Sequence, residues 1–311
     1  MRRLLALPLA GVLCTLVACG LGPGEVQEGN GARLSITRDF GQRELGGAEL
    51  EAITERDSAM SLLRKSADVD TEYGGRFVQA IDGLEGGGSG GNLDWFFWVN
   101  GAEGVTGAAE QQLAPGDVVQ WDYRDWQATM SIPAIVGAYP EPFAHGLGGD
   151  RLPIRVECGD PDGAACDEVK GSLEDAGALA PGAALGAGGG KELLRVIVGP
   201  WSELQELRAA EALAEGPRAS GVFARPAPTG IELLDRHGES STTLGAGSGL
   251  IAATVPAGLA PTWFVTGVDE AGVEAAAGAL DAETLRDAFA VAIEAGGQVT
   301  RLPVAPSPDR P

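Results

Sequence analysis

Apolar and polar residues alternate in several short stretches between residues 33 and 126, a pattern typical of strands with one buried face. In the stretch RLSITRDF, Leu34 and Ile36 would face a core, while Ser35 and Thr37 would face away from it. The other strands expected in this region are residues 44–53, 77–84, 94–101 and 118–126.

One helix is expected among these strands. Met60, Leu63 and Ala67 recur at helical spacing, and Asp57 or Ser58 lies where an N-cap residue is needed. Strands around a single helix predict a small α+β domain, to which we assign residues 33–145.

The pattern changes after residue 150, where strands and helices are expected to alternate. Strands are expected at 152–158, 191–201, 221–226, 231–235, 249–256, 262–268 and 298–304. Helices are expected at 166–177, 202–216, 269–280 and 281–297, with Ser202 as the cap of the second, and residues 181–190 read as a loop. Residues 151–304 are therefore predicted to form an α/β domain of unknown type, and residues 305–311 a disordered tail.

The N-terminus has the pattern of a secretory signal peptide. Two arginines precede an uncharged apolar stretch that ends at Ala18. The sequence Leu-Val-Ala-Cys ending at Cys19 resembles the bacterial lipobox, which implies removal of residues 1–18 and lipidation of Cys19; the alternative is an ordinary cleaved signal with an accidental cysteine. Residues 19–32 are rich in glycine and predict a flexible tether. We therefore expect a lipid-anchored protein on the extracytoplasmic face of the cell membrane.

Charge and hydropathy restrict the function classes. The chain has 44 acidic and 22 basic residues, for a net charge of −22, which argues against nucleic acid as a partner. Beyond the signal region, no segment is continuously apolar for the roughly 20 residues that a membrane-spanning helix requires.

Two cysteines, Cys158 and Cys166, lie outside the signal region, and in an exported protein they suggest one disulfide bond. A zinc site is the alternative, but the chain has only two histidines and no pair at ligand spacing. Asp160 and Asp162 beside a glycine read as a turn, because the periodicity of a calcium loop is missing. We expect neither a metal nor a cofactor.

Two short motifs resemble enzyme signatures without the context that chemistry requires. Ser89 fits the pattern GxSxG, but a nucleophile elbow needs a strand before the serine and a helix after it. Several glycines precede Lys191, as in a phosphate-binding loop, but the residue after the lysine is Glu192, where such a loop needs Ser or Thr. We expect a non-catalytic protein; a hydrolase that uses Asp or Glu remains an alternative without a supporting motif.

Aromatic residues concentrate between residues 95 and 126, in a chain otherwise poor in them. In both expected strands of this region they occupy both faces; the residues are Trp95, Phe96, Phe97, Trp98, Trp121, Tyr123 and Trp126. One interpretation is a core together with a sheet face covered by the second domain. The other is a ligand-binding platform, because aromatic patches mark contacts.

The stretches TRDFG, SAMSLLRK, DWFFWVNG and VVQWDYRDW resemble a bacterial domain family related to the C-terminal β-domain of transcobalamin and intrinsic factor. The VNG turn followed by a GD turn and an aromatic strand is the most specific part, and the resemblance covers about a third of the chain. It implies a β-grasp-like fold and capture of cobalamin or another bulky organic ligand near an uptake transporter. The α-helical barrel that completes the cobalamin site in the carriers has no counterpart in this sequence.

The leading hypothesis is therefore a lipid-anchored ligand-capture protein that delivers a small organic molecule, such as a corrinoid, to a membrane transporter. Its candidate ligand contacts are Trp98, Asn100, Trp121, Asp122, Tyr123, Trp126, Tyr139 and His145. The alternative is a non-catalytic adaptor or assembly subunit at the membrane surface, in which the same aromatics form an interface between domains.

Overall fold

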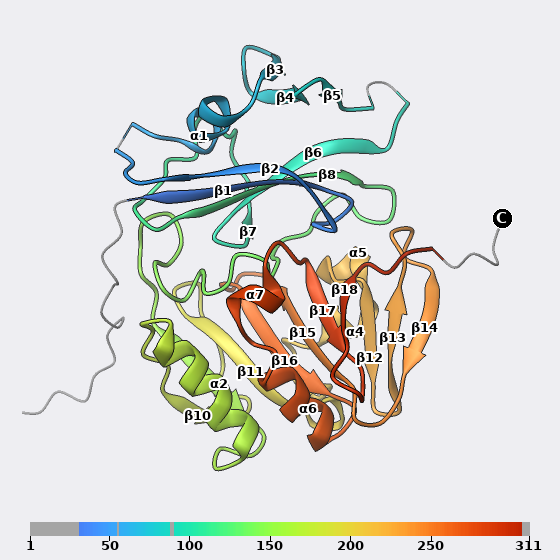
Figure 1. The fold of residues 1–311 in the computed structure, drawn as a ribbon. Coiled ribbons are helices and arrows are strands. Elements are labelled where there is room, and N and C mark those ends of the chain that lie inside the picture. The colour runs from blue at the N-terminus through green and yellow to red at the C-terminus, as the bar shows by residue number, and fades with distance from the viewer. Residues whose placement is uncertain (1–30, 55, 88–89, 307–311) are drawn as a thin grey trace, which may run out of the picture.

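The computed structural model describes residues 31–54, 56–87 and 90–306. The expected signal peptide, the lipidation site Cys19 and nearly all of the expected tether lie outside these residues, as do Ser89 and the end of the expected tail. Figure 1 shows two packed units, which we call the first unit (residues 32–125) and the second unit (residues 154–304). Strands exceed helices in both, which agrees with the expected mixture of the two.

The first unit contains one helix and eight strands among its described residues. They are β1 (Ala32–Arg38), β2 (Arg43–Leu50), α1 (Ala59–Ser66), β3 (Val69–Glu72), β4 (Phe77–Ile81), β5 (Leu84–Glu85), β6 (Leu93–Val99), β7 (Ala102–Glu103) and β8 (Val118–Asp125). The main sheet has the order β2-β1-β8-β6-β7, in which β1 and β8 are parallel and the other pairs are antiparallel. Helix α1 and the small sheet β3-β4-β5 lie on the side of this sheet that faces away from the second unit (Figure 1).

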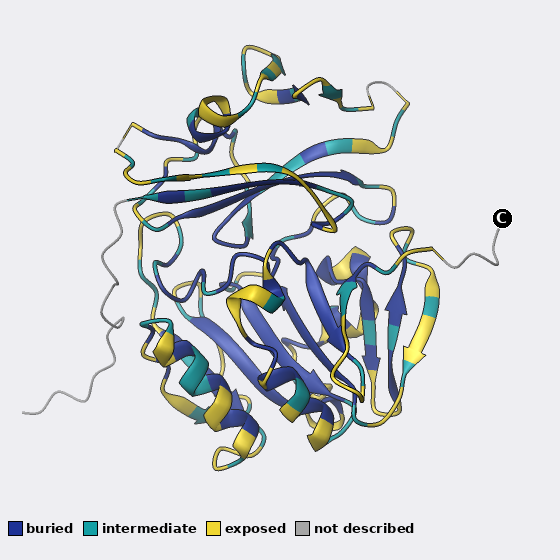
Figure 2. Ribbon diagram, in the orientation of Figure 1, coloured by how far each residue is buried: buried dark blue, intermediate teal, exposed yellow. Residues whose placement is uncertain are grey.

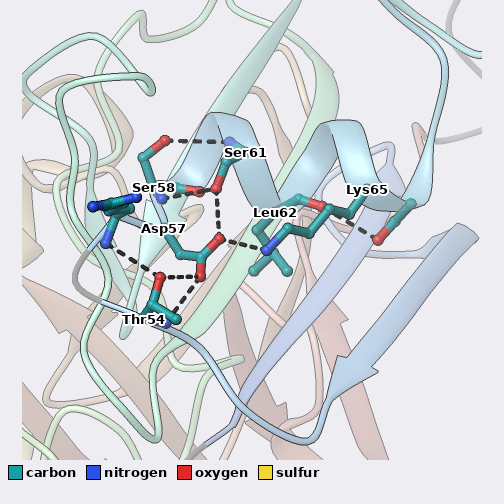
Figure 3. A network of polar contacts seen from close by, with 8 residues as sticks. Thr54, Asp57, Ser58, Ser61, Leu62 and Lys65 are labelled. Atoms are coloured by element: carbon teal, nitrogen blue, oxygen red, sulfur yellow. Dashed lines mark hydrogen bonds and ion pairs between the residues drawn. The ribbon is translucent and has the colours of Figure 1, made fainter.

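Figure 3 shows why α1 begins where it does. Ser58 is the N-cap: its hydroxyl accepts from the Ser61 amide, and the Ser61 hydroxyl accepts from the Ser58 amide. Asp57 accepts hydrogen bonds from Lys65, Thr54 and Ser61, and the bond from Lys65 is the largest cause that lowers the pKa of Asp57. The predicted helix is confirmed, with Ser58 as its cap.

The second unit is built on a seven-stranded mixed sheet with the order β10-β9-β11-β16-β15-β17-β18, and a three-stranded sheet β12-β13-β14. The elements are β9 (Ile154–Cys158), α2 (Ala164–Asp175), β10 (Gly182–Ala184), β11 (Leu194–Pro200), α3 (Trp201–Leu204), α4 (Glu211–Glu215), α5 (Pro217–Ser220), β12 (Ala224–Ala227), β13 (Gly230–Leu234), β14 (Ser240–Leu244), β15 (Gly249–Thr254), β16 (Thr262–Gly267), α6 (Glu270–Ala277), α7 (Ala282–Leu285), β17 (Ala290–Ile293) and β18 (Val299–Leu302). The four strands from β10 to β16 are parallel, and the rest of the large sheet is antiparallel.

Both faces of the large sheet are buried (Figure 2). Helices α2 and α6 supply Val169, Leu173, Val273 and Ala276 to the core on one face. The core on the other face contains residues of α3, α4, β12 and β13, and also residues of the first unit.

Three sequence predictions in the second unit are wrong in detail. The predicted helix 281–297 is only α7 followed by strand β17, whose residues alternate between the two cores of the sheet. The predicted helix 202–216 breaks into α3 and α4, and Pro200 rather than Ser202 is the N-cap of α3. The predicted loop 181–190 contains β10. Continuous apolar runs do not distinguish a buried strand from a buried helix, and packing overrides propensity in short segments.

The predicted disulfide bond is confirmed. Cys158 at the end of β9 is bonded to Cys166 in the first turn of α2. The bond links helix α2 to strand β9 in the parallel part of the large sheet.

Replacing both Cys158 and Cys166 by Ser should lower the free energy of unfolding by about 2–3 kcal/mol, because the unfolded chain loses a closed loop. Urea unfolding with and without dithiothreitol measures this. The reductant should destabilise the wild type and leave the double variant unchanged; equal sensitivity of both proteins would contradict the bond's contribution.

Candidate functional site: the interface between the units

The sheet of the first unit has two different faces. One face is apolar and packs on α1; its residues include Leu34, Ile36, Trp95, Val99, Val119, Trp121 and Tyr123. The other face points toward the second unit and is largely polar or aromatic; its residues are Arg33, Ser35, Thr37, Phe96, Trp98, Gln120, Asp122 and Arg124. Most of these side chains are buried. A buried polar face needs partners for its hydrogen-bonding groups.

Aromatic contacts join the two units. Phe40, in the turn between β1 and β2, packs its ring against Phe223 and Phe289 of the second unit, with centroid distances of 5.0 and 5.5 Å. Trp98 also contacts Phe289, at 4.9 Å, and its indole nitrogen donates to the carbonyl of Ile132. Phe40 and Trp98 therefore belong to a core of the second unit.

Arg124 lies among the aromatic rings of this interface. Its guanidinium carbon is 3.8 Å from the centroid of Phe96 and 5.9 Å from those of Phe40 and Trp98. One guanidinium nitrogen donates to the carbonyl of Thr129, 3.0 Å away. Burial is the main cause that lowers the pKa of Arg124 to about 10.

Asp122 holds the turn that carries Phe40. Its carboxylate accepts hydrogen bonds from the Thr37 hydroxyl at 2.7 Å, the Phe40 amide at 3.0 Å and the Gly41 amide at 2.9 Å. The side chain is completely buried, and burial raises its pKa to about 6, although these hydrogen bonds act in the opposite direction.

Asp287, in the segment between α7 and β17, is fixed against the first unit by close backbone contacts. Its amide donates to Gly137, and its carbonyl accepts from the Gln120 side chain at 3.0 Å. A Cβ atom on Gly41 would lie 1.8 Å from the Asp287 carbonyl oxygen, so only glycine fits there. Asp287 itself has φ +59°, a left-handed conformation that is strained for a residue with a side chain.

Two buried acceptors at this contact have no hydrogen-bond partner among the described residues: the side-chain oxygen of Gln120 and Oδ1 of Asp287. Asp287 and Arg286 also line one side of an open groove of about 240 Å³, whose other side is formed by β1 and β2, including Arg33, Ser35 and Glu49. Strained backbone and unpartnered buried acceptors concentrate at functional sites, so this contact is a candidate site.

The structure separates the eight candidate contacts predicted from the sequence. Trp98 and Asp122 lie on the face toward the second unit. Trp121 and Tyr123 are buried on the opposite face, where Trp121 stacks on Phe97 at 4.9 Å and Tyr123 donates to the carbonyl of Glu85. Trp126 is half-buried just after β8.

The other three candidates fix the segment that connects the units. Asn100 donates from its side chain to Asp117 and to the carbonyl of Gly146, both at 2.7 Å. Tyr139 donates to the carbonyl of Ser172 and lies in the core of the second unit. His145 lies 2.5 Å from Glu141. The eight candidate residues therefore do not form one exposed platform in this structure.

Four residues of this interface were not predicted from the sequence: Arg33, Phe40, Gln120 and Asp287. The alternation of Gln120, Asp122 and Arg124 with aromatic residues signals two unlike faces, but nothing in the sequence indicates that Asp287 meets them. Among the described residues, no group of three His, Cys, Asp or Glu side chains could hold a metal ion. The same part of the chain has no helix long and apolar enough to cross a membrane.

Residues 57–125 match a family model described as Domain of unknown function (DUF4430). The match covers the first unit from just before α1 to the end of β8 and does not extend into the second unit. No curated protein matches the chain.

The buried carboxyl group of Asp122 predicts a pH dependence. Its pKa is raised from 3.8 to about 6, so the folded state binds the proton more tightly than the unfolded chain. Protonated Asp122 therefore makes its full contribution to the free energy of unfolding below pH 4. About 3 kcal/mol of this contribution is lost as the pH rises through 6. The stability advantage of the wild type over Asp122→Asn should shrink by this amount between pH 4 and 8 in urea unfolding. An advantage that is constant, or that grows with pH, would contradict the raised pKa; Asp150→Asn, at an exposed position, is the control.

Proposed function

We propose that this protein is a non-catalytic, lipid-anchored capture protein on the extracytoplasmic face of the membrane, which binds a small polar molecule between its two units and delivers it to an uptake transporter. The open groove beside Asp287, where the two units meet, is the observation that carries the proposal. Ligand sites occur preferentially at interfaces between domains, and this one has a strained residue and an unpartnered buried acceptor.

Two features support this assignment, one in the N-terminal sequence and one in the first unit. The signal-like N-terminal sequence and the cysteine at its end resemble those of a lipoprotein, which supports lipid anchoring. The sheet order β2-β1-β8-β6-β7, with β1 parallel to β8 and one helix on the apolar face, supports the β-grasp-like fold implied by the resemblance to the transcobalamin-type family. The ligand that we propose is smaller than cobalamin. The groove volume of about 240 Å³ lies below the roughly 300–1,000 Å³ of pockets that bind drug-sized molecules, and a corrinoid is larger still.

An adaptor or assembly subunit is the second candidate. It is supported by the use of Trp98 and Phe40 inside the molecule, which assigns the aromatic residues to an interface instead of a ligand platform. Tyr73 and Phe77, on the hairpin farthest from the second unit, are exposed and contact each other, which would suit a protein partner.

Native mass spectrometry on the full chain purified in detergent distinguishes the two candidates. The capture proposal expects a mass surplus equal to a small organic molecule, lost on denaturation, and no retained cobalamin or cobinamide when either is added. Retention of no small molecule from a host-cell extract would contradict capture and favour the adaptor.

A further inference from the structure

The second unit contains a cavity that the proposed function does not use. Its volume is about 510 Å³, which lies within the roughly 300–1,000 Å³ of pockets that bind small molecules. The lining comes from the glycine-rich segment 186–189, from α4 and the residues just before it, and from the segment 256–259 between β15 and β16. The cavity shares no lining residue with the groove between the units. Its apolar lining includes Leu207, Ala209, Ala212, Pro256 and Leu259.

Arg195, the second residue of β11, brings a guanidinium group to this cavity. Its side chain is only 5% exposed and forms an ion pair with the fully buried Glu157 of β9. Nε and Nη2 of Arg195 donate to the two carboxylate oxygens of Glu157, at 2.8 and 2.7 Å. Because the two hydrogen bonds are parallel, the ion pair holds the guanidinium plane in one orientation.

The ion pair leaves part of the guanidinium group available. An arginine has five N–H donors, and Glu157 accepts from two of those of Arg195. The Nη1 atom has no hydrogen-bond partner among the described residues. Unlike Nε of Arg124, it is not fully enclosed by protein. Nη1 can therefore donate to a molecule that enters the cavity.

Polar contacts fix the glycine-rich segment beside the ion pair. The Gly186 amide donates to Glu157 at 3.1 Å, and Arg155 donates to two carbonyls of the segment at 3.3 and 2.9 Å. A Cβ atom on Gly189 would lie 2.8 Å from Cδ of Arg195, so glycine lets the segment pack directly on the arginine side chain. This part of the lining is therefore in place before a ligand arrives, which lowers the entropy cost of binding.

We propose that this cavity binds a small uncharged molecule with an apolar body and a carbonyl or amide oxygen, and that this oxygen accepts a hydrogen bond from Nη1 of Arg195. Glu157 balances the charge of Arg195, so the buried end of the cavity offers a donor without a net charge. A carboxylate would place a second negative charge close to the buried Glu157, and an ammonium group cannot accept a hydrogen bond. The apolar body would contact residues such as Leu207 and Leu259. This site is independent of the groove between the units.

Ligand-observed NMR on the full chain in detergent tests the class of ligand. The probes are hexanamide, hexanoate and hexylammonium, which share one alkyl chain and differ in the charge of the head group. A sample of detergent alone corrects for probe bound to micelles. We expect hexanamide to bind at least tenfold more tightly than either charged probe. Equal or tighter binding of a charged probe, or binding of none of the three at millimolar concentration, would overturn the proposal.

A matched pair of variants on α4 tests the location. Ala212→Leu fills part of the cavity without changing its charge and should weaken hexanamide binding at least tenfold. Ala214→Leu makes the same change at an exposed position outside the lining and should bind as the wild type does. Unchanged affinity in Ala212→Leu, or equal losses in both variants, would overturn the location.

Arg195→Lys tests the role of the guanidinium group. Lysine keeps a positive charge beside Glu157 and removes Nη1, so hexanamide binding should weaken at least tenfold, and thermal unfolding checks that the variant has folded. Wild-type affinity in a folded Arg195→Lys would overturn the role assigned to Arg195. If this variant does not fold, the probe series and the variants on α4 decide, because neither depends on it.

Discussion

The fold depends on one buried turn. Asp122 accepts hydrogen bonds from the Thr37 hydroxyl at the end of β1 and from the Phe40 and Gly41 amides of the following turn, and Phe40 packs in the core of the second unit. A buried carboxylate without such donors would be strongly unfavourable, so the turn conformation and the Asp122 side chain stabilise each other. Gly41 completes the contact, because any larger residue would collide with the Asp287 backbone.

This arrangement explains why the sheet of the first unit carries polar residues on a face that is not exposed to water. Phe40 and Trp98 make the apolar contacts with the second unit, and Gln120 donates a directed hydrogen bond across the interface to the Asp287 carbonyl, while Thr37 and Asp122 bond to each other within the first unit. Directed bonds fix the relative position of the units, which apolar packing alone does not do. The cost is two buried acceptors without donors, one on Gln120 and one on Asp287, and Asp287 also lines the groove that we propose as the binding site.

Much of the fold follows from local sequence. The alternation in RLSITRDF and VVQWDYRDW predicted β1 and β8, and the Ser58 cap predicted the start of α1, because both signals depend on neighbours in the sequence. The helix predicted at 281–297 failed because the apolar run before Ile293 suits a buried strand equally well. The candidate site required long-range information: Asp287 meets Gln120 and Gly41 only after both units have folded, and no periodicity records that contact. Trp121 and Asp122 were grouped as ligand contacts, but adjacent strand residues point to opposite faces.

The interface through Phe40 should make the two units unfold as one cooperative structure. Differential scanning calorimetry of the wild type and of Phe40→Ala is the most direct test. We expect one wild-type transition with equal calorimetric and van't Hoff enthalpies, and two separate transitions in Phe40→Ala, which loses about 3–5 kcal/mol of packing at the interface. Two independent transitions in the wild type, or an unchanged single transition in the variant, would contradict it.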